Sequence, residues 1–390
     1  MEHRLPERAR PRVHALVTPP RLATRAAALA LFGAVAATLV AGVLGGLGRL
    51  GAAPALEAPW AGQALLAHAA LMIGGFFGTV IGLERAVALR HPAAFAGPVA
   101  SAAGALALLA GQAELGRALL WLASLAFCAA NVAIVRRQRA AHTGLLLVAA
   151  GAWGVGNTLF ALDGASGPVL PWWFAFLVLT IAAERLEMTR LSRRRPAALP
   201  AFTAIVVLLL AGAAASAWSP RDGGLLFGAA LVALAGWLFI FDIARHTLRA
   251  AGLARYMAVC LLAGYAWLAV GGVAWAATAH GAATRDLALH ALGLGFVFGM
   301  VMGHAPVILP ALTRLKLQFG IAFYAPLAAL HASLLWRFGA GFSDLARRAG
   351  GAQLNALALL WFALTVVGAI VVWRLRHGRA DAARPGRRRA

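Results

Sequence analysis

The chain has 390 residues, of which 62% are apolar and 12% are charged. Soluble domains average about 45–50% apolar and about 25% charged residues, so this composition excludes a disordered chain, a coiled coil and an ordinary soluble enzyme. The formal net charge of +22 is divided among the segments between apolar blocks, which argues against a nucleic-acid partner. Cys128 and Cys260 each lie inside an apolar block, so neither a disulfide nor a cysteine-based metal centre is expected.

Apolar blocks of about 20 residues recur along the chain, and a helix of that length crosses a bilayer core of about 30 Å. We therefore predict an all-α polytopic membrane bundle of about twelve spans. In chain order the predicted spans are residues 26–47, 62–83, 94–112, 117–135, 143–161, 169–184, 200–217, 224–242, 256–277, 287–309, 318–338 and 354–373. Residues 26–373 then form a single transmembrane domain, with basic tails at 1–25 and 374–390.

The basic residues predict how this bundle is oriented. If the N-terminus is cytoplasmic, 28 of the 35 Lys and Arg residues fall on the cytoplasmic side, Arg185 among them. The other side keeps Arg49, Arg117, Arg221, Arg285, Arg337, Arg347 and Arg348. Because cytoplasmic loops carry the excess of positive charge, we expect both termini in the cytoplasm and the chain in the bacterial cytoplasmic (inner) membrane. The lipid bilayer is then its immediate partner.

Four histidines lie within predicted spans, where ionisable side chains are costly to bury and mark functional candidates: His68, His290, His304 and His331. A helical rise of about 1.5 Å per residue places His68 about 9 Å, His290 about 5 Å and His331 about 10 Å below the outer surface. Histidines on facing helices hold haem or metal ions in bundles, although a single one more often packs and hydrogen-bonds. Three at one level predict a cofactor and metal site in the outer leaflet.

We predict His68 and His290 as the two axial ligands of one b-type haem, which bis-imidazole ligation would make low-spin. Glycines on nearly the same helix faces are expected to leave room for the macrocycle: Gly75, Gly82 and Gly293. His331 is then expected either to hydrogen-bond a haem propionate or to begin a nearby copper site.

Two glycine runs stand out in the second and tenth spans. They are Gly74-x3-Gly78-x3-Gly82 and Gly295-x3-Gly299-x3-Gly303. Small residues every four positions let either a neighbouring helix or a flat ligand approach the backbone, and helix packing is the commoner explanation.

The cytoplasmic ends of the second and tenth spans carry Glu84 and His304, which we predict to be coupled in a proton relay. An interfacial ion pair between Glu84 and Arg85 is the alternative. Pro306 and Pro310 are expected to break the tenth helix beyond His304. Three further carboxylates are expected to be interfacial: Glu184, Glu187 and Asp242.

Residues 67–78 (AHAALMIGGFFG) and 290–296 (HALGLGF) resemble the NnrS family of bacterial membrane proteins. The family's motif in the second helix is roughly H-A-H-E-M, which this chain matches at His68, Ala69 and Met72. The resemblance also extends to the span count and topology of the whole chain. It implies a twelve-span protein that binds haem and copper and acts in the response to nitric oxide.

The chain is more remotely similar to subunit I of the haem–copper oxidases. In those proteins a low-spin haem lies between a histidine of helix 2 and one of helix 10, and His68 and His290 stand at the matching places. The oxidase copper site also needs histidines on helices 6 and 7, and the predicted sixth and seventh spans contain none. The similarity therefore disfavours a terminal oxidase.

The function expected from these residues is that of a haem-binding membrane protein, either a redox module or a nitric oxide response factor. Its electron donor would be a membrane or periplasmic protein. Two alternatives stay open, namely a secondary transporter of a small solute and a cofactor-free membrane assembly factor. Transporters tend to place broken helices and charges at the midplane, where the predicted spans carry almost no charge.

Overall fold

The computed structural model describes residues 25–53, 58–164, 167–188 and 196–382, and no strand occurs in these ranges. Twelve of the described helices are long and apolar enough to cross a membrane, which confirms the predicted number. They are α1 (Arg25–Gly48), α2–η1–α3 (Pro59–Leu89), η2–α4 (Pro92–Leu109), α5 (Ala113–Arg137), α6 (Ala141–Asp163), α7 (Val169–Met188), α8 (Ala198–Ala215), α9 (Pro220–Phe241), α11 (Gly252–Ala279), α12–η4–α13 (Arg285–Thr313), η5–α14 (Ile321–Phe338) and α15 (Leu345–Ala382). The short helix α10 (Ala244–Thr247) joins α9 to α11.

The last helix is longer than its predicted span. The sequence predicts a start at residue 354, but α15 begins at Leu345, because the Asp344 carboxylate accepts a hydrogen bond from the Arg347 backbone N–H at 3.0 Å. At its other end α15 continues to Ala382, into the region predicted as a basic tail. The predicted tail residues 1–24 and 383–390 lie outside the described residues, as do the arginines at 190 and 193–195.

The prolines in the tenth span do not break it, contrary to expectation. Pro306 and Pro310 both lie inside α13, which continues to Thr313 and ends where Arg314 adopts a left-handed conformation with φ 61°. Membrane helices tolerate proline because neighbouring helices and local backbone adjustments compensate for the lost hydrogen bond.

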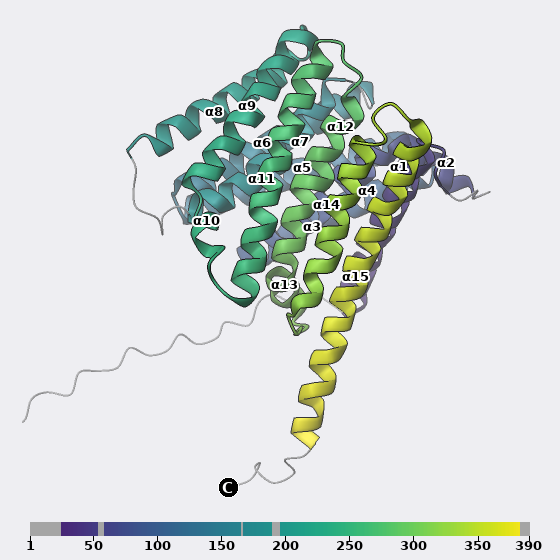
Figure 1. The fold of residues 1–390 in the computed structure, drawn as a ribbon, viewed down its shortest axis with the longest axis vertical. Helices are drawn as coiled ribbons and strands as arrows, with labels where there is room; N and C mark the ends of the chain where they lie inside the picture. Colours follow the sequence, from purple (N-terminus) through teal and green to yellow (C-terminus); the bar gives the residue numbers. More distant parts are fainter. Residues whose placement is uncertain (1–24, 54–57, 165–166, 189–195, 383–390) are drawn as a thin grey trace, which may run out of the picture.

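Consecutive helices pack side by side through most of the bundle, and α1 also contacts α15 (Figure 1). The best covered spans are the sixth, tenth and second, of which 78%, 61% and 56% are buried inside the protein. The last span is only 17% buried, and its apolar face is available to lipid. The histidines at 68, 290 and 304 therefore lie on central helices.

Both central helices that carry these histidines contain a π-helical stretch. Segment η1 (Ala70–Gly78) begins two residues after His68, and η4 (Ala291–Phe298) begins directly after His290. The two stretches meet through aromatic rings, since Phe76 and Phe298 stack with centroids 5.7 Å apart and planes at 4°. π-Helical turns are rare and are frequent at functional sites, so their position beside the histidines is informative.

The glycine runs serve helix packing. Side chains of neighbouring helices occupy the space that a Cβ would need at most of these positions, as with Leu120 at Gly74, Trp153 at Gly78 and Trp267 at Gly295. The structure therefore favours the packing explanation of the glycine runs over a ligand beside them.

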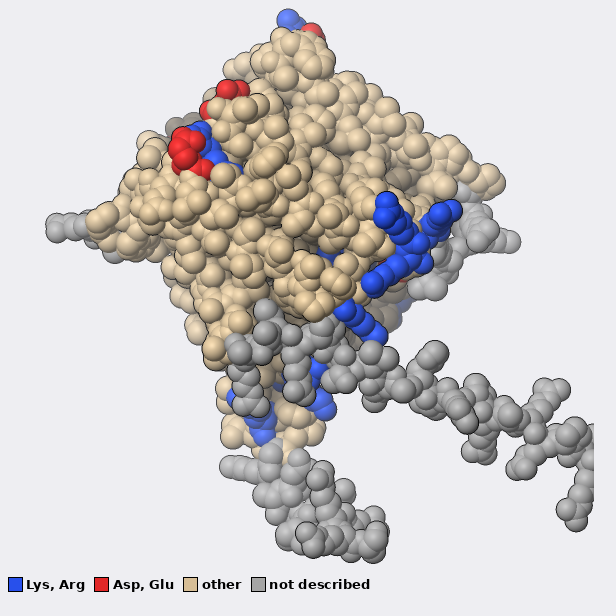
Figure 2. Space-filling view, turned by 180° about the vertical axis from the view of Figure 1, so that it is seen from behind, with Lys and Arg blue, Asp and Glu red and all other residues tan. Residues whose placement is uncertain are grey.

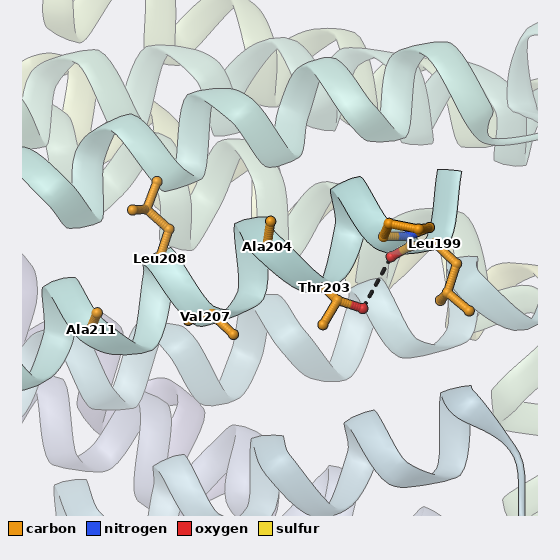
Figure 3. Close-up of a pocket in the computed structure, with 7 residues that line it drawn as sticks. Leu199, Thr203, Ala204, Val207, Leu208 and Ala211 are labelled. Atoms are coloured by element: carbon orange, nitrogen blue, oxygen red, sulfur yellow. Dashed lines mark hydrogen bonds between the residues drawn. The ribbon is translucent and has the colours of Figure 1, made fainter. Parts of the chain in front are cut away.

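Charged side chains gather near the edges of the face seen in Figure 2, and a broad uncharged area separates them. An apolar hollow of about 700 Å³ runs along α8 and is shown in Figure 3. Its polar side chain, Thr203, donates its hydroxyl hydrogen to the Leu199 carbonyl at 3.0 Å. This hollow consequently offers no free polar group, and the chemistry is sought elsewhere.

Candidate functional site

The structure brings His68 and His290 together across the bundle. His68 lies near the end of α2 and His290 at the end of α12. Their ring centroids are 6.2 Å apart and their planes are inclined by 23°. Two imidazoles from helices more than 200 residues apart in sequence thus form one pair.

Each of these imidazoles uses its Nδ1 atom in a hydrogen bond. His68 Nδ1 lies 2.7 Å from the Gly42 carbonyl oxygen, and His290 Nδ1 lies 3.0 Å from the Asp286 carbonyl and 2.9 Å from its carboxylate. Neither Nε2 atom has a hydrogen-bond partner among the described side chains and backbone groups. An Nδ1–H held by a carbonyl or carboxylate fixes the tautomer that leaves the Nε2 lone pair free, as in metal-binding histidines.

Glycines of α1 make room for the His68 ring. A Cβ at Gly46 would lie 2.7 Å from Cε1 of His68, and a Cβ at Gly42 would lie 2.6 Å from the sulfur of Met72. One helical turn of α1 therefore provides both the surface under the imidazole and the carbonyl that binds its Nδ1.

An ion pair that the sequence analysis missed supports His290. Arg337 donates to both carboxylate oxygens of Asp286, at 2.7 and 3.2 Å, and also to the Asn355 side-chain oxygen at 3.3 Å. Asn355 in turn donates to Ser333 at 2.7 Å. The sequence predicts Arg337 at the outer end of the eleventh span, and the residue is only 3% exposed. The spacing Asp286-x3-His290, one helical turn, is a sequence signal for the contact of Asp286 with His290, but it does not identify Arg337.

His331 contacts Trp267 and makes no hydrogen bond or ring contact with either histidine of the pair. Its Nδ1 accepts a hydrogen bond of 3.0 Å from the indole N–H of Trp267, and its Nε2 is buried with no partner in the described part of the chain. Within that part, no group of three or more His, Cys, Asp or Glu side chains has an arrangement that could hold a metal ion. The structure thus pairs His68 with His290, and the role of His331 beside them stays a prediction.

Only one of the three glycines expected to leave room for a macrocycle does so. The space beside Gly75 is filled by Ala105, at 2.6 Å from a built Cβ, and the space beside Gly82 by Pro98 at 3.4 Å. Gly293 faces open space, with no atom within 4 Å. Gly75 of η1 and Gly82 of α3 instead pack against α4. The sequence pattern alone cannot distinguish such close packing from a cleft for a ligand.

At the other end of the bundle, His304 contacts an arginine and makes no hydrogen bond to Glu84. Its Nε2 lies 3.2 Å from a guanidinium nitrogen of Arg185, and its Nδ1 lies 2.8 Å from the Met300 carbonyl. The coupling of His304 to Glu84 stays a prediction, since no direct hydrogen bond joins the two side chains, while Glu84 interacts electrostatically with the ring. Arg185 was counted among cytoplasmic loop charges, but it is 8% exposed within α7.

Glu84 belongs to a three-residue ion cluster. One guanidinium nitrogen of Arg85 donates to Glu84 at 3.0 Å and to Glu184 at 2.9 Å. The ion pair of Glu84 with Arg85 is thus present, and Glu184 joins it from α7. The same Glu-Arg dipeptide ends the second and the sixth span, at 84–85 and 184–185, and this repetition is the signal that the sequence analysis overlooked.

Asp242, which is predicted to be interfacial, is covered by protein and only 2% exposed. Its carboxylate accepts a hydrogen bond from the Tyr265 hydroxyl of α11 and another from the backbone N–H of Ile243 at 2.6 Å. Sequence position alone does not reveal this burial, because a residue at a helix end faces either solvent or a neighbouring helix.

We expect Tyr265→Phe to lower the free energy of unfolding by about 1–3 kcal/mol, because it removes a donor from a buried carboxylate. Thermal unfolding in detergent measures the loss. Tyr324→Phe is the matched control, since the Tyr324 hydroxyl makes no hydrogen bond within the described structure, and it should change stability by less than about 0.5 kcal/mol. Equal effects of the two substitutions would contradict the role of the Tyr265 hydroxyl.

The chain belongs to the family described as Domain of unknown function (DUF8744), whose sequence model matches residues 25–371. The search of curated proteins and the search of solved structures gave no match. The matched region contains both the histidine pair and the ion cluster at the opposite end. The resemblance to the NnrS family stays a prediction.

Proposed function

We propose that this membrane protein binds one b-type haem between His68 and His290 and acts as a redox module or nitric oxide response factor of the NnrS type. The observation that carries the proposal is the 6.2 Å separation of the two ring centroids. Imidazoles on opposite sides of one metal ion have centres about 6 Å apart, since each metal–nitrogen bond is about 2 Å and each nitrogen lies about 1 Å from its ring centre. Both Nε2 atoms are free to bind.

Open space on one side of the histidine pair could accommodate a flat group such as haem. Gly293 leaves open space beside η4, and the stacked rings of Phe76 and Phe298 close the bundle about two turns deeper. Haem bound there would supply an iron with both axial positions taken, and such an iron transfers electrons without binding a further ligand.

The chain's own groups prepare the two imidazoles for this role. The Gly42 carbonyl and the Asp286 carboxylate hold an Nδ1–H on each ring, which aims the Nε2 lone pairs away from these acceptors. Arg337 balances the charge of Asp286, so the carboxylate can stay ionised beside His290. The Gly42 carbonyl therefore sets the tautomer of His68 before any metal arrives, whereas His290 Nδ1 also has a guanidinium nitrogen of Arg337 at 3.4 Å.

The proposals on membrane orientation, copper and protons rest on the amino-acid sequence. The excess of basic residues supports cytoplasmic termini and the bacterial inner membrane, with the histidine pair toward the periplasm and an electron donor in the membrane or periplasm. Imidazole also binds copper well. We propose that the Nε2 atom of His331, which has no hydrogen-bond partner, binds a nearby copper ion. Glu84 and His304 are proposed to handle protons at the inner end.

Absorption and EPR spectroscopy of the purified protein test the haem proposal. We expect a low-spin b-type haem, and we expect His68→Ala and His290→Ala each to abolish or convert its signal. His331→Ala is the matched control, because His331 bonds to Trp267 and is not proposed as a ligand of the haem iron, so the low-spin signal should persist. A colourless protein from cells supplied with ample haem would defeat the proposal and favour the transporter alternative.

A further inference from the structure

A polar cavity of about 260 Å³ lies where α3, α5, α6 and α7 end or begin at the same end of the bundle. Ionisable and amide side chains line it: Arg85, Arg137, Gln138, His142, Glu184 and Glu187. The cavity is at the opposite end of the bundle from the pair of His68 and His290, and none of its lining residues contacts that pair.

Two buried polar atoms of the cavity wall have no partner in the described structure, namely His142 Nδ1 and Arg85 Nε. His142 is only 6% exposed, and its other nitrogen lies 3.7 Å from the Glu187 carboxylate. Leaving such groups unbonded is costly. Ordered water normally satisfies buried polar groups, but neither of these two atoms is itself exposed to the cavity. At about 30 Å³ per molecule, a cavity of this size holds roughly eight waters.

The cavity borders the ion cluster of the inner end. Arg85 and Glu184 line it, while Glu84 is bonded to the same Arg85 nitrogen without lining the cavity. Two carboxylates that share one guanidinium leave one negative charge uncompensated. A proton that enters from the cavity and binds one of the two carboxylates would neutralise this negative charge.

The neighbouring groups do not remove this surplus. Those that face the cluster or the cavity from the packed helices are Arg137 of α5, His142 of α6, Arg185 and Glu187 of α7, Asp242 after α9, Tyr265 of α11 and His304 of α13. The charges of Arg185 and Asp242 cancel, as do those of Arg137 and Glu187. The neutral side chains of His142, Tyr265 and His304 add no charge.

We propose that this cavity is a water-filled chamber through which protons from the aqueous phase reach Glu184 and Glu84. A hydronium ion in the chamber gives its proton to a carboxylate oxygen of Glu184 and becomes water. The carboxyl hydrogen then passes to Glu84, which interacts with His304. The proposal rests on the relay role proposed for Glu84 and His304, and it does not require haem.

Thiol accessibility tests the chamber. Ala182 and Ala183 are adjacent in α7 and both 0% exposed, but only Ala183 lines the cavity. Both native cysteines are first replaced by Cys128→Ala and Cys260→Ala. Ala183→Cys or Ala182→Cys is then added, and inverted vesicles of each variant are treated with a small methanethiosulfonate reagent that carries an ammonium group. We expect Ala183→Cys to react at least about tenfold faster, a barrier difference of about 1.4 kcal/mol. Equally slow reactions overturn the chamber. Thr143→Cys, also at the cavity, replaces Ala183→Cys if that variant does not fold.

Infrared spectroscopy tests the proton path. We expect a protonated carboxyl band that shifts in D₂O and is lost in Glu84→Gln or Glu184→Gln. Reagent bound at Ala183→Cys should fill the chamber and slow the D₂O shift at least about tenfold relative to the unlabelled variant. Absence of the band, or an unchanged rate, overturns the proton path. The haem spectrum is recorded on the same samples, so failure of the chamber is distinguishable from failure of the proposed function.

Discussion

Replacing Arg337 by alanine is expected to lower the free energy of unfolding by about 3–5 kcal/mol, because it leaves the Asp286 carboxylate without its charged partner inside the bundle. The guanidinium is 3% exposed, contacts both carboxylate oxygens, and connects α14 to α12 and to Asn355 of α15. Removing it therefore also removes bonds between three helices. The loss is measured by thermal or denaturant unfolding in detergent.

The matched control is Arg347→Ala. Arg347 pairs with Asp344 at 3.3 Å, but their side chains are 60% and 41% exposed. An ion pair in water contributes about 0–1 kcal/mol, so this substitution should cost little. Adding Asp286→Asn to Arg337→Ala removes the unpaired charge and should recover part of the stability. Equal losses for Arg337→Ala and Arg347→Ala would show that burial does not strengthen the Arg337 pair.

Hydropathy and charge were sufficient to predict the twelve helices, because burying about 20 apolar residues in lipid is a local property of each segment. The level of each histidine also follows from its place in a span. The rotation of each helix about its own axis does not follow, and it decides which side chains meet. This is why His331, predicted at the level of His68 and His290, makes its contact with Trp267 of α11.

The charged residues were the least predictable part. Arg185, Arg337 and Asp242 stand at helix ends, where a shift of two or three residues separates a loop charge from a buried one. Their partners, Tyr265, Asp286 and His304, are between 23 and 119 residues away in sequence, so no local pattern identifies them. The π-helical stretches were equally hidden, because their residues are as apolar as those of an α-helical span.

Gly45→Ala is expected to destabilise the protein by about 1–3 kcal/mol and to weaken the low-spin haem signal. A Cβ at Gly45 would overlap the backbone carbonyl of Ala64 in α2, and backbone cannot rotate away as a side chain can. Helices α1 and α2 must then separate. Because the Gly42 carbonyl holds His68 from the adjacent turn of α1, that separation should also move the imidazole.

Gly33→Ala in the same helix is the matched control, since no atom lies within 4 Å of its built Cβ. Alanine is favoured over glycine within a helix by about 0.5–1 kcal/mol, so this control should be neutral or stabilising. Gly46→Ala should fall between the two, because the built Cβ meets the His68 ring, which can shift. Unfolding experiments and the visible spectrum of the three variants measure both effects. If Gly45→Ala behaves like Gly33→Ala, close packing of α1 on α2 does not position His68.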